Sequence, residues 1–501
     1  MRSRKLRFLV NAPIILRGLG LIVQVAGWMA LLSLPVALFF REHYAVLPLL
    51  ITAGVSLALG WGAYWAFRRA GETTLAHGMI ISSLGWLLIP ILGALPFYLI
   101  ALLAREPGVA QGTAAFTQPL NAFFEGMSGF TGTGLTMVLR PEDLPRTLQW
   151  WRSFMQWVGG IGVILFMLAL VSGPGTYSLY YAEARAEKIH PSIRSTVRTI
   201  WWIFLLYTGA SILLLWIAGM PVWDAINHGM TGIATGGFST RSNSIAYYGN
   251  FWLELALLPV MIMGALSFAV HYQWLSSRKF RTFWEDSQSR WFLVILAGGI
   301  VFLGLENLLR LPPLAAFREA GFQFTSALCT AGLQSTDLHG WSETGKLLLA
   351  LAMVLGAAAG STGGGIKVVR TLILARGIRW RLRKLIAPRN VLVPFRLGKQ
   401  PLSDEQAAAH LIEAGVLLIL WWAFLGIGVL VLLHAAPSGY SLGDVIFEVV
   451  SAQGNVGLSS GLTGPGLPVA AKLMLCLNMW LGRLEIIPIL LLFRAIFRGL
   501  D

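Results

Sequence analysis

Residues 229–240 read GMTGIATGGFST, a polar stretch between two long apolar runs. The runs are TIWWIFLLYTGASILLLWIAG before it and FWLELALLPVMIMGALSFAV after it. An apolar run of about 20 residues is long enough to cross the roughly 30 Å hydrocarbon core of a membrane. The stretch between the runs contains four glycines and four hydroxyl residues, and it is too short to cross. The organisation of the chain therefore depends on what this stretch does.

The composition is that of a membrane protein, because 56% of the 501 residues are hydrophobic and 12% are charged. Soluble domains carry about 25% charged residues. The first apolar run is long and no small-residue cleavage site follows it, which argues against a signal peptide. We expect a multi-pass protein whose spans lie near 16–40, 44–67, 77–103, 149–172, 197–219, 251–276, 289–310, 346–376, 409–434 and 468–497.

The net charge of +15 is concentrated in alternate loops, including RSRKLR, RRAGE, EARAEKIHPSIRSTVR, SRKFR and RGIRWRLRKLIAPR. By the positive-inside rule these loops and both termini are cytoplasmic, which predicts a protein of the cell (inner) membrane. The loops are either plain topology determinants or docking surfaces for an acidic partner or anionic lipid, and the dense run from Arg376 to Lys399 favours docking. A nucleic-acid role would need a soluble basic fold, which the sequence lacks.

The opening stretch has three relatives in the chain, which indicate an internal repeat. Aligned on one glycine, the copies are AFFEGMSGFTGTGL (122–135), AINHGMTGIATGGF (225–238), AGFQFTSALCTAGL (320–333) and VIFEVVSAQGNVGL (445–458). The shared glycines are Gly134, Gly237, Gly332 and Gly457. A hydroxyl lies six residues before each glycine, at Ser128, Thr231, Ser326 and Ser451, and a polar side chain lies nine before, at Glu125, His228, Gln323 and Glu448.

Each copy is interpreted as a re-entrant half-helix followed by an extended strand. Backbone that is not helical at membrane depth is tolerated where it is buried in protein or lines a water-filled cavity. Four similar strands therefore suggest one cavity on a pseudo-fourfold axis, where carbonyl oxygens replace the hydration shell of a cation. The negative ends of the half-helix dipoles favour a cation at the same place. The alternative for a single copy is an extracellular loop with an amphipathic turn.

The segments TGTGL, ATGGF, CTAGL and GNVGL resemble the filter sequences of the TrkH/KtrB/HKT superfamily of K⁺ transporters. QWVGGIGVILF (156–166), GAAAGSTGGGIKVVR (356–370) and NMWLGRLEIIPILLLF (478–493) resemble further helices of that superfamily, and the two extra N-terminal spans make the chain similar to its TrkH-like members. The resemblance implies a K⁺ ion at backbone carbonyls of Gly132, Thr133, Gly134, Thr235, Gly236, Gly237, Thr330, Ala331, Gly332, Asn455, Val456 and Gly457. Glycine at all four anchors goes with K⁺ preference, whereas Gly132 and Asn455 stand where the superfamily commonly has threonine.

The overlong segment 346–376 is interrupted by GAAAGSTGGG, and glycine this dense does not hold a helix. The interruption is either a site of close helix packing through small residues or an intramembrane gate. The resemblance favours a gate built from Gly360, Ser361, Thr362, Gly363, Gly364, Gly365 and Lys367. A phosphate-binding loop is excluded because Ile366 separates Gly365 from Lys367 and no strand precedes it.

Charged residues inside apolar spans are costly and usually face a cavity or the protein interior. Arg483 and Glu485 are two residues apart, so they do not share a helix face and we do not expect them to pair. The resemblance places Arg483 below the filter as an electrostatic barrier, while Glu485 is expected to meet a cation on the cytoplasmic side. Glu125 and Glu448 either attract cations to the outer mouth or bond the half-helix backbone. Cys329 is interpreted as a small buried hydrophobe.

The sequence thus predicts an all-α polytopic membrane protein with four helix–pore loop–helix repeats around a central pore. The expected units are 1–75 as an accessory two-helix unit and repeats at 76–190, 191–285, 286–400 with the gate, and 401–501. It is not expected to be an enzyme or to hold an organic cofactor. The resemblance implies K⁺ uptake, a TrkA-like cytoplasmic nucleotide-binding regulatory subunit and a homodimer in the lipid bilayer. The alternatives are a Na⁺-permeable or proton-coupled member of the superfamily, a secondary transporter with broken helices, and a membrane-embedded enzyme.

Overall fold

The computed structural model describes residues 2–162, 189–190, 192–388, 391, 393–397 and 400–499. Within them, six helices are long and apolar enough to span a membrane, or up to eight spans if each of two bent helix pairs counts as one. The six lie in α1 (Arg2–Phe39), α2 (Val46–Ala66, with the turn before it), α3 (Leu75–Leu103), α9 (Ile193–Ile217), α14 (Ser287–Asn307) and α18 (Asp404–Ala435). The prediction of a multi-pass, mainly helical membrane protein is confirmed.

Two of the expected spans are not continuous. The stretch 251–276 divides into α11 (Phe251–Ala265) and α12 (Phe268–Ser277), which meet at an angle of 107°. The stretch 468–497 divides into α20 (Val469–Arg483) and α21 (Ile487–Arg498), at 109°. Each pair is therefore a broken span or a re-entrant segment rather than one straight helix. At the first break, Phe268 N–H donates to the Gly360 carbonyl at 3.1 Å.

The interruption predicted within 346–376 is present, between α16 (Glu343–Leu355) and α17 (Val368–Ile386). The expected span at 149–172 begins as α6 (Arg146–Ile161), and its remainder lies outside the described residues, as do parts of the basic loops near 183–191 and 389–399.

The four repeat segments form short helices that cannot cross a membrane, as predicted. They are α5 (Pro119–Thr131), α10 (Val222–Ile233), α15 (Pro313–Leu328) and α19 (Leu442–Gln453). In chain order each lies between two further helical segments. The residues that follow each short helix are extended but are not paired into a sheet. In the described part of the chain, the strands are β1 (Phe395–Leu397) and β2 (Gln400–Leu402), which pair antiparallel with Phe395 opposite Leu402.

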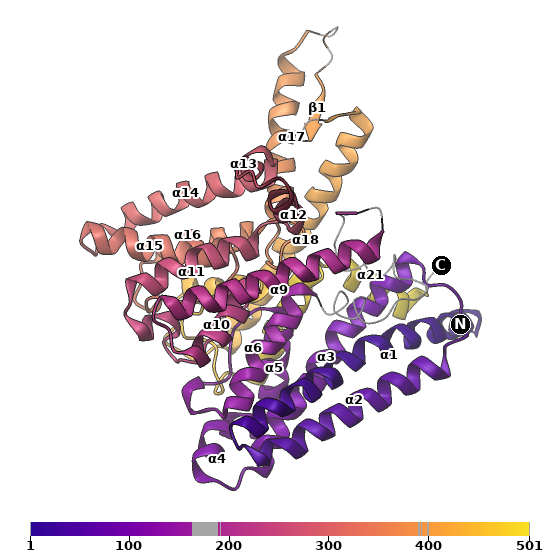
Figure 1. Ribbon diagram of the computed structural model, residues 1–501. Helices are drawn as coiled ribbons and strands as arrows, with labels where there is room; N and C mark the ends of the chain where they lie inside the picture. Colours follow the sequence, from indigo (N-terminus) through magenta and orange to yellow (C-terminus); the bar gives the residue numbers. More distant parts are fainter. Residues whose placement is uncertain are drawn as a thin grey trace.

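The remaining described helices are short and lie in the connections. They are α4 (Pro107–Thr113), α13 (Arg281–Glu285) and the 3₁₀ turns His43–Ala45, Ala114–Thr117, Pro141–Asp143 and Ser244–Tyr248. The pair α1 and α2 lies at one side of the molecule, against α3, and the start of α1 and the end of α21 lie near each other (Figure 1).

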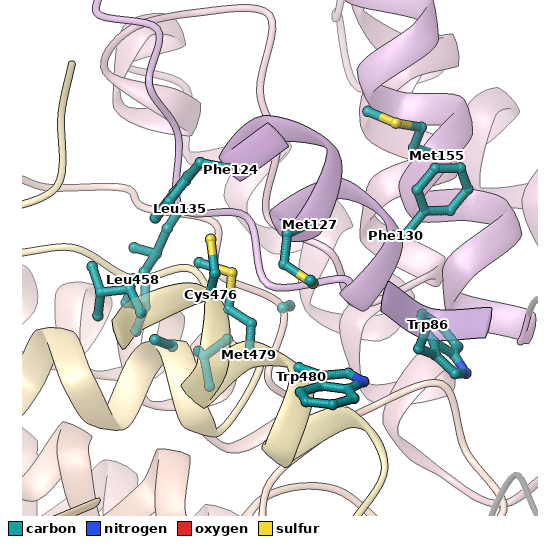
Figure 2. Close-up of a cluster of buried hydrophobic side chains, with 14 of the residues drawn as sticks. Trp86, Phe124, Met127, Phe130, Leu135, Met155, Leu458, Cys476, Met479 and Trp480 are labelled. Carbon is teal, nitrogen blue, oxygen red and sulfur yellow. The ribbon is translucent and has the colours of Figure 1, made fainter. Parts of the chain in front are cut away.

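The hydrophobic core joins α5, the short helix of the first repeat segment, to α20 near the end of the chain. Figure 2 shows Met127 of α5 pointing toward Met479 and Trp480 of α20, with Phe124 near Leu135 and the Phe130 ring beside Met155. Trp86 of α3 and Met155 of α6 complete the edge of this core. Segments about 350 residues apart are therefore packed together, so the end of the chain closes against its beginning.

Close backbone contacts in this region predict which glycines the fold requires. A Cβ atom on Gly159 of α6 would lie 2.0 Å from the Phe130 carbonyl oxygen. We expect Gly159→Ala to destabilise the protein by about 1–3 kcal/mol, because backbone must shift. The matched control is Gly209→Ala on α9, where a Cβ atom meets nothing within 4 Å. Thermal unfolding in detergent should show a lower Tm for the first variant alone, and equal Tm values would contradict this packing.

Candidate functional site

All four short helices end in the same backbone turn. The residue two before each anchor glycine has a left-handed conformation, with φ of 70° at Gly132, 52° at Thr235, 55° at Thr330 and 52° at Asn455. The next amide then donates to the carbonyl five residues back, in the bonds Thr133–Ser128, Gly236–Thr231, Ala331–Ser326 and Val456–Ser451. This is the Schellman helix end, in which a left-handed residue stops the helix.

The turn bears on two features of the sequence pattern. The residue six before each glycine accepts this bond through its backbone carbonyl, so the bond does not require the hydroxyl found there. Gly132 and Asn455 depart from the superfamily's threonine, but glycine and asparagine adopt left-handed backbone more readily than other residues. The departures therefore suit the observed conformation.

The four anchor glycines meet in a closed ring. A Cβ atom on each would approach the carbonyl oxygen just before the next anchor: Gly134 to Gly236 at 2.4 Å, Gly237 to Ala331 at 3.1 Å, Gly332 to Val456 at 2.0 Å and Gly457 to Thr133 at 2.2 Å. All four glycines have φ between 67° and 100°. Both the space and the backbone angle exclude a side chain here. We call Gly134, Gly237, Gly332 and Gly457 the glycine ring.

Cavities lie on both sides of the glycine ring. One of about 220 Å³ is lined by the ring itself and by residues that follow it in all four segments, such as Thr136, Ser239, Gln334 and Ser459. A second, of about 30 Å³, is lined by Asn455 at the end of α19, by Gly482 and Arg483 of α20 and by residues 360–367. The ring separates a wide polar vestibule from a narrow space.

The narrow space is bounded by residues 356–367, which we call the interrupting loop. Thr362 Oγ1 donates to the carbonyls of Ile233 and Gly264, at 3.1 and 2.9 Å. Gly364 N–H donates to Thr330 Oγ1 at 2.9 Å, and Gly365 N–H donates to the Gly454 carbonyl at 3.0 Å. The loop is thus bonded to the ends of the second, third and fourth short helices, directly beside the glycine ring.

Glycine dominates the interrupting loop because the loop touches other backbone. A Cβ atom on Gly364 would lie 2.2 Å from the Gly454 carbonyl oxygen, and one on Gly363 would lie 2.4 Å from the Ala357 Cβ. Positive φ values occur at Gly360, Gly365 and Lys367. Ser361 donates to the Ala358 carbonyl. The structure therefore brings all seven predicted loop residues together with the ring segments.

The two charged residues at the end of α20 have separate partners, as predicted. Arg483 donates to the Thr362 carbonyl at 3.3 Å and to carbonyls of Gly159 and Gly160, and its guanidinium carbon lies 4.9 Å from the centre of the Trp86 ring. Its charge thus borders the narrow cavity.

Glu485 holds the other end of the interrupting loop. Its carboxylate pairs with Lys367 at 2.7 Å and also with Arg370. Glu485 and Ile486 have φ of 58° and 70°, so the break between α20 and α21 carries strained backbone at the point where the ion pairs form. Ion pairs therefore link the interrupting loop and the start of α17 to the break between α20 and α21.

The polar residues nine before each glycine brace the segment after it. Glu125 accepts from Thr136 Oγ1 at 2.9 Å, and Glu448 accepts from Ser459 Oγ at 2.8 Å. The other two pairs are His228 with Ser239 at 2.9 Å and Gln323 with Ser335 at 3.3 Å. Glu125 and Glu448 are fully buried, which disfavours the outer-mouth reading. The alternative was that both carboxylates bond the backbone of their own half-helix. In the structure they bond the segment that follows the ring instead.

The sequence analysis did not predict several further side-chain contacts that hold the ring segments. Arg152 of α6 pairs with Glu125 at 2.7 Å, and both side chains are at most 2% exposed. Gln156, one turn further on, bonds the Gly236 carbonyl and accepts from Phe238 N–H. Asn455 donates to Thr133 Oγ1 at 3.0 Å and so links the fourth segment to the first. A signal was present, since Arg152 and Gln156 are four apart on a buried helix and the hydroxyls Thr136, Ser239, Ser335 and Ser459 follow the glycines at nearly constant spacing.

The described residues do not form a metal site of histidine, cysteine or acidic side chains. No group of three or more histidine, cysteine or acidic side chains there could hold a metal ion. Cys329 is buried beside the third ring segment, in keeping with its reading as a small hydrophobe.

Comparisons with known proteins identify relatives along nearly the whole chain. The sequence model of TrkH, described as a cation transport protein, matches residues 51–498. The Trk system potassium uptake protein TrkH of Salmonella typhimurium is 32% identical, over 95% of this chain and 97% of its own. An uncharacterized cation transporter of Methanocaldococcus jannaschii is 31% identical, over 96% and 95%. The crystal structure of the potassium transporter TrkH from Vibrio parahaemolyticus superposes with a TM-score of 0.83 at 28% identity, covering 97% of this chain and 99% of that one.

The buried Arg152–Glu125 pair generates a stability prediction. We expect Glu125→Gln to cost about 3–5 kcal/mol, because Arg152 would remain buried without its counter-ion. Glu285→Gln is the matched control, since its pair with Arg281 is exposed and such pairs contribute about 1 kcal/mol or less. Thermal unfolding in detergent measures both. A similar small loss in both variants would show that the brace does not stabilise the segment.

Proposed function

Because the chain belongs to the TrkH family of cation transport proteins, we propose that it takes up K⁺ across the cell membrane through a pore centred on the glycine ring. The observation that carries this proposal is the closure of four equivalent segments into one ring, each presenting a carbonyl oxygen beside the next glycine. The family transports cations, so no bond chemistry is required.

In this proposal the ring segments 132–134, 235–237, 330–332 and 455–457 form the selectivity filter. Carbonyl oxygens there replace the hydration shell of K⁺ as it passes. Four short helices end at the filter, and the negative ends of their dipoles lower the energy of a cation. The braces from Glu125, His228, Gln323 and Glu448 hold the outer end of each filter segment at a fixed distance from its helix.

The interrupting loop acts as the gate. Its bonds to Ile233, Thr330 and Gly454 support a position across the path below the filter, beside a cavity of about 30 Å³. A space of that size is close to the volume of one water molecule. Movement of the loop away from the filter opens the pore. Arg483, beside the same cavity, raises the energy of a cation and shortens its stay.

Regulation is proposed to come from outside this chain. The relatives named Trk system proteins indicate a multi-component uptake system, and a TrkA-like nucleotide-binding subunit on the cytoplasmic side is the partner that the resemblance implies. Assembly of two copies into a homodimer and the placement of both termini in the cytoplasm stay predictions from the resemblance and the charge pattern.

Substitution of the ring glycines tests the filter. We expect wild type to restore growth in low K⁺ to cells without their own K⁺ uptake. Gly134→Ser and Gly332→Ser should lower the preference for K⁺ over Na⁺ on the order of tenfold, the effect of about 1.4 kcal/mol of lost coordination. Gly340→Ser is the control, because a Cβ atom there meets nothing within 4 Å.

Each result has a defined meaning. If both ring variants keep the selectivity of the control, the ion path lies elsewhere. If wild type admits Na⁺ as readily as K⁺, the protein is the Na⁺-permeable alternative. Absence of rescue calls for co-expression with the regulatory subunit, and failure to rescue then would contradict K⁺ uptake.

The ion pairs of Glu485 test the gate. Glu485→Gln removes the charge that holds Lys367 and Arg370, so the loop should leave its closed position more often. We expect basal Rb⁺ flux into proteoliposomes to rise on the order of tenfold for about 1.4 kcal/mol lost from the closed state. Glu413→Gln, at an exposed position on α18, is the control. Unchanged or reduced flux in folded Glu485→Gln protein would refute the gate.

A further inference from the structure

We propose that an arginine-lined pocket on the cytoplasmic extension of the protein binds the phosphate headgroup of an anionic phospholipid. The pocket lies between α17 and β1 and has a volume of about 430 Å³. Its lining includes the guanidinium groups of Arg376, Arg379, Arg383 and Arg396 and the rings of Trp380 and Phe395. We call these six residues the arginine pocket.

Within the described part of the chain, no carboxylate neutralises the positive charge of the arginine pocket. Among the residues that the structure describes, no ion pair joins any of its four arginines to a carboxylate, although Lys384 nearby pairs with Asp404. Positive groups held together without a counter-ion attract an anion, and arginine suits phosphate because its planar fork donates two parallel hydrogen bonds.

Specific contacts between α17 and the segment 393–396 hold the pocket in shape. Trp380 Nε1 donates to the Val393 carbonyl at 2.8 Å, and its ring meets Phe395 edge-on at 5.8 Å between centroids. Arg376 donates to the Arg396 carbonyl at 3.3 Å. These contacts fix the strand segment against α17, so Arg396 faces the three arginines that α17 presents at helical spacing.

The pocket lies away from the glycine ring, along α17. This helix begins at Val368, beside the interrupting loop, and rises 1.5 Å per residue. Arg376 and Arg383 therefore lie roughly 12 to 22 Å along the helix from its start. In Figure 1, α17, β1 and the first turns of α18 project together from the body, with α13 at their base.

An apolar stripe beside the pocket indicates a lipid rather than a soluble anion. Ile378, Leu382, Leu385 and Ile386 of α17 are between 53% and 83% exposed. They recur at helical spacing on the flank that adjoins Arg379. A helix with a basic face and an exposed apolar face suits the membrane interface, where the stripe contacts acyl chains and the arginines meet phosphate.

The test measures how many anionic lipids the protein retains. Full-length protein in nanodiscs of phosphatidylcholine with phosphatidylglycerol or cardiolipin is released and weighed by native mass spectrometry. We expect wild type to retain anionic lipid and Arg379→Gln/Arg383→Gln to retain at least about tenfold less, since each arginine near a membrane surface contributes about 1 kcal/mol. Arg381→Gln is the matched control, because it is exposed on the same helix but does not line the pocket.

Three outcomes would overturn the proposal. One is equal lipid retention by wild type, the double variant and the control, with equal Tm values confirming that all three are folded. Another is displacement of the bound lipid signal by millimolar inorganic phosphate or nucleotide in wild type, which would assign the pocket to a soluble phosphate compound. A double variant that loses binding of a cytoplasmic protein but keeps its lipid would likewise refute the lipid site.

Discussion

A backbone amide or carbonyl at membrane depth needs a partner, because each unsatisfied group costs several kcal/mol in hydrocarbon. This constraint governs the centre of the protein, where four chain segments leave the helical conformation within one small region. Each segment meets the constraint at its helix end in the same way. A left-handed residue ends the helix, and the following amide bonds back five residues. In the first and fourth segments, Glu125 and Glu448 also accept from backbone amides beyond the glycine. The interrupting loop and the side chain of Gln156 satisfy further groups from outside.

The same constraint explains why glycine is concentrated at the ring and in the loop. The four ring segments approach so closely that carbonyl oxygens occupy the space of a side chain, with separations between 2.0 and 3.1 Å from the missing Cβ atoms. In the interrupting loop, Gly364 makes the same kind of close contact with the carbonyl oxygen of Gly454. Close backbone contact of this kind leaves carbonyl oxygens as the main polar groups beside the path, which is the chemistry that a dehydrated cation requires.

Charge is used in distinct ways at three levels along the proposed path. On the outer side, Arg152 and Glu125 neutralise each other in the protein interior and hold a ring segment in place. Below the ring, Arg483 stays close to the narrow cavity, while Glu485 is neutralised by the loop that it holds. The arginine pocket on α17 is proposed to meet anionic lipid. Positive side chains thus serve in neutralised structural pairs, in the proposed barrier and in the proposed lipid-binding pocket.

The sequence by itself determined the membrane class, the four repeats, the positions of the ring glycines and the break within 346–376, because hydropathy, spacing and glycine content are local properties. It also predicted that Arg483 and Glu485 do not pair, on the assumption that both lie on one helix, whereas in the structure Glu485 lies in the break after α20. Tertiary structure decided the breaks at Leu266 and Glu485, the partners of Glu125 and Glu448, and the roles of Arg152 and Gln156. Each of these depends on which group of a distant segment lies close in space. An apolar run such as FWLELALLPVMIMGALSFAV does not show which distant backbone group will bond to it.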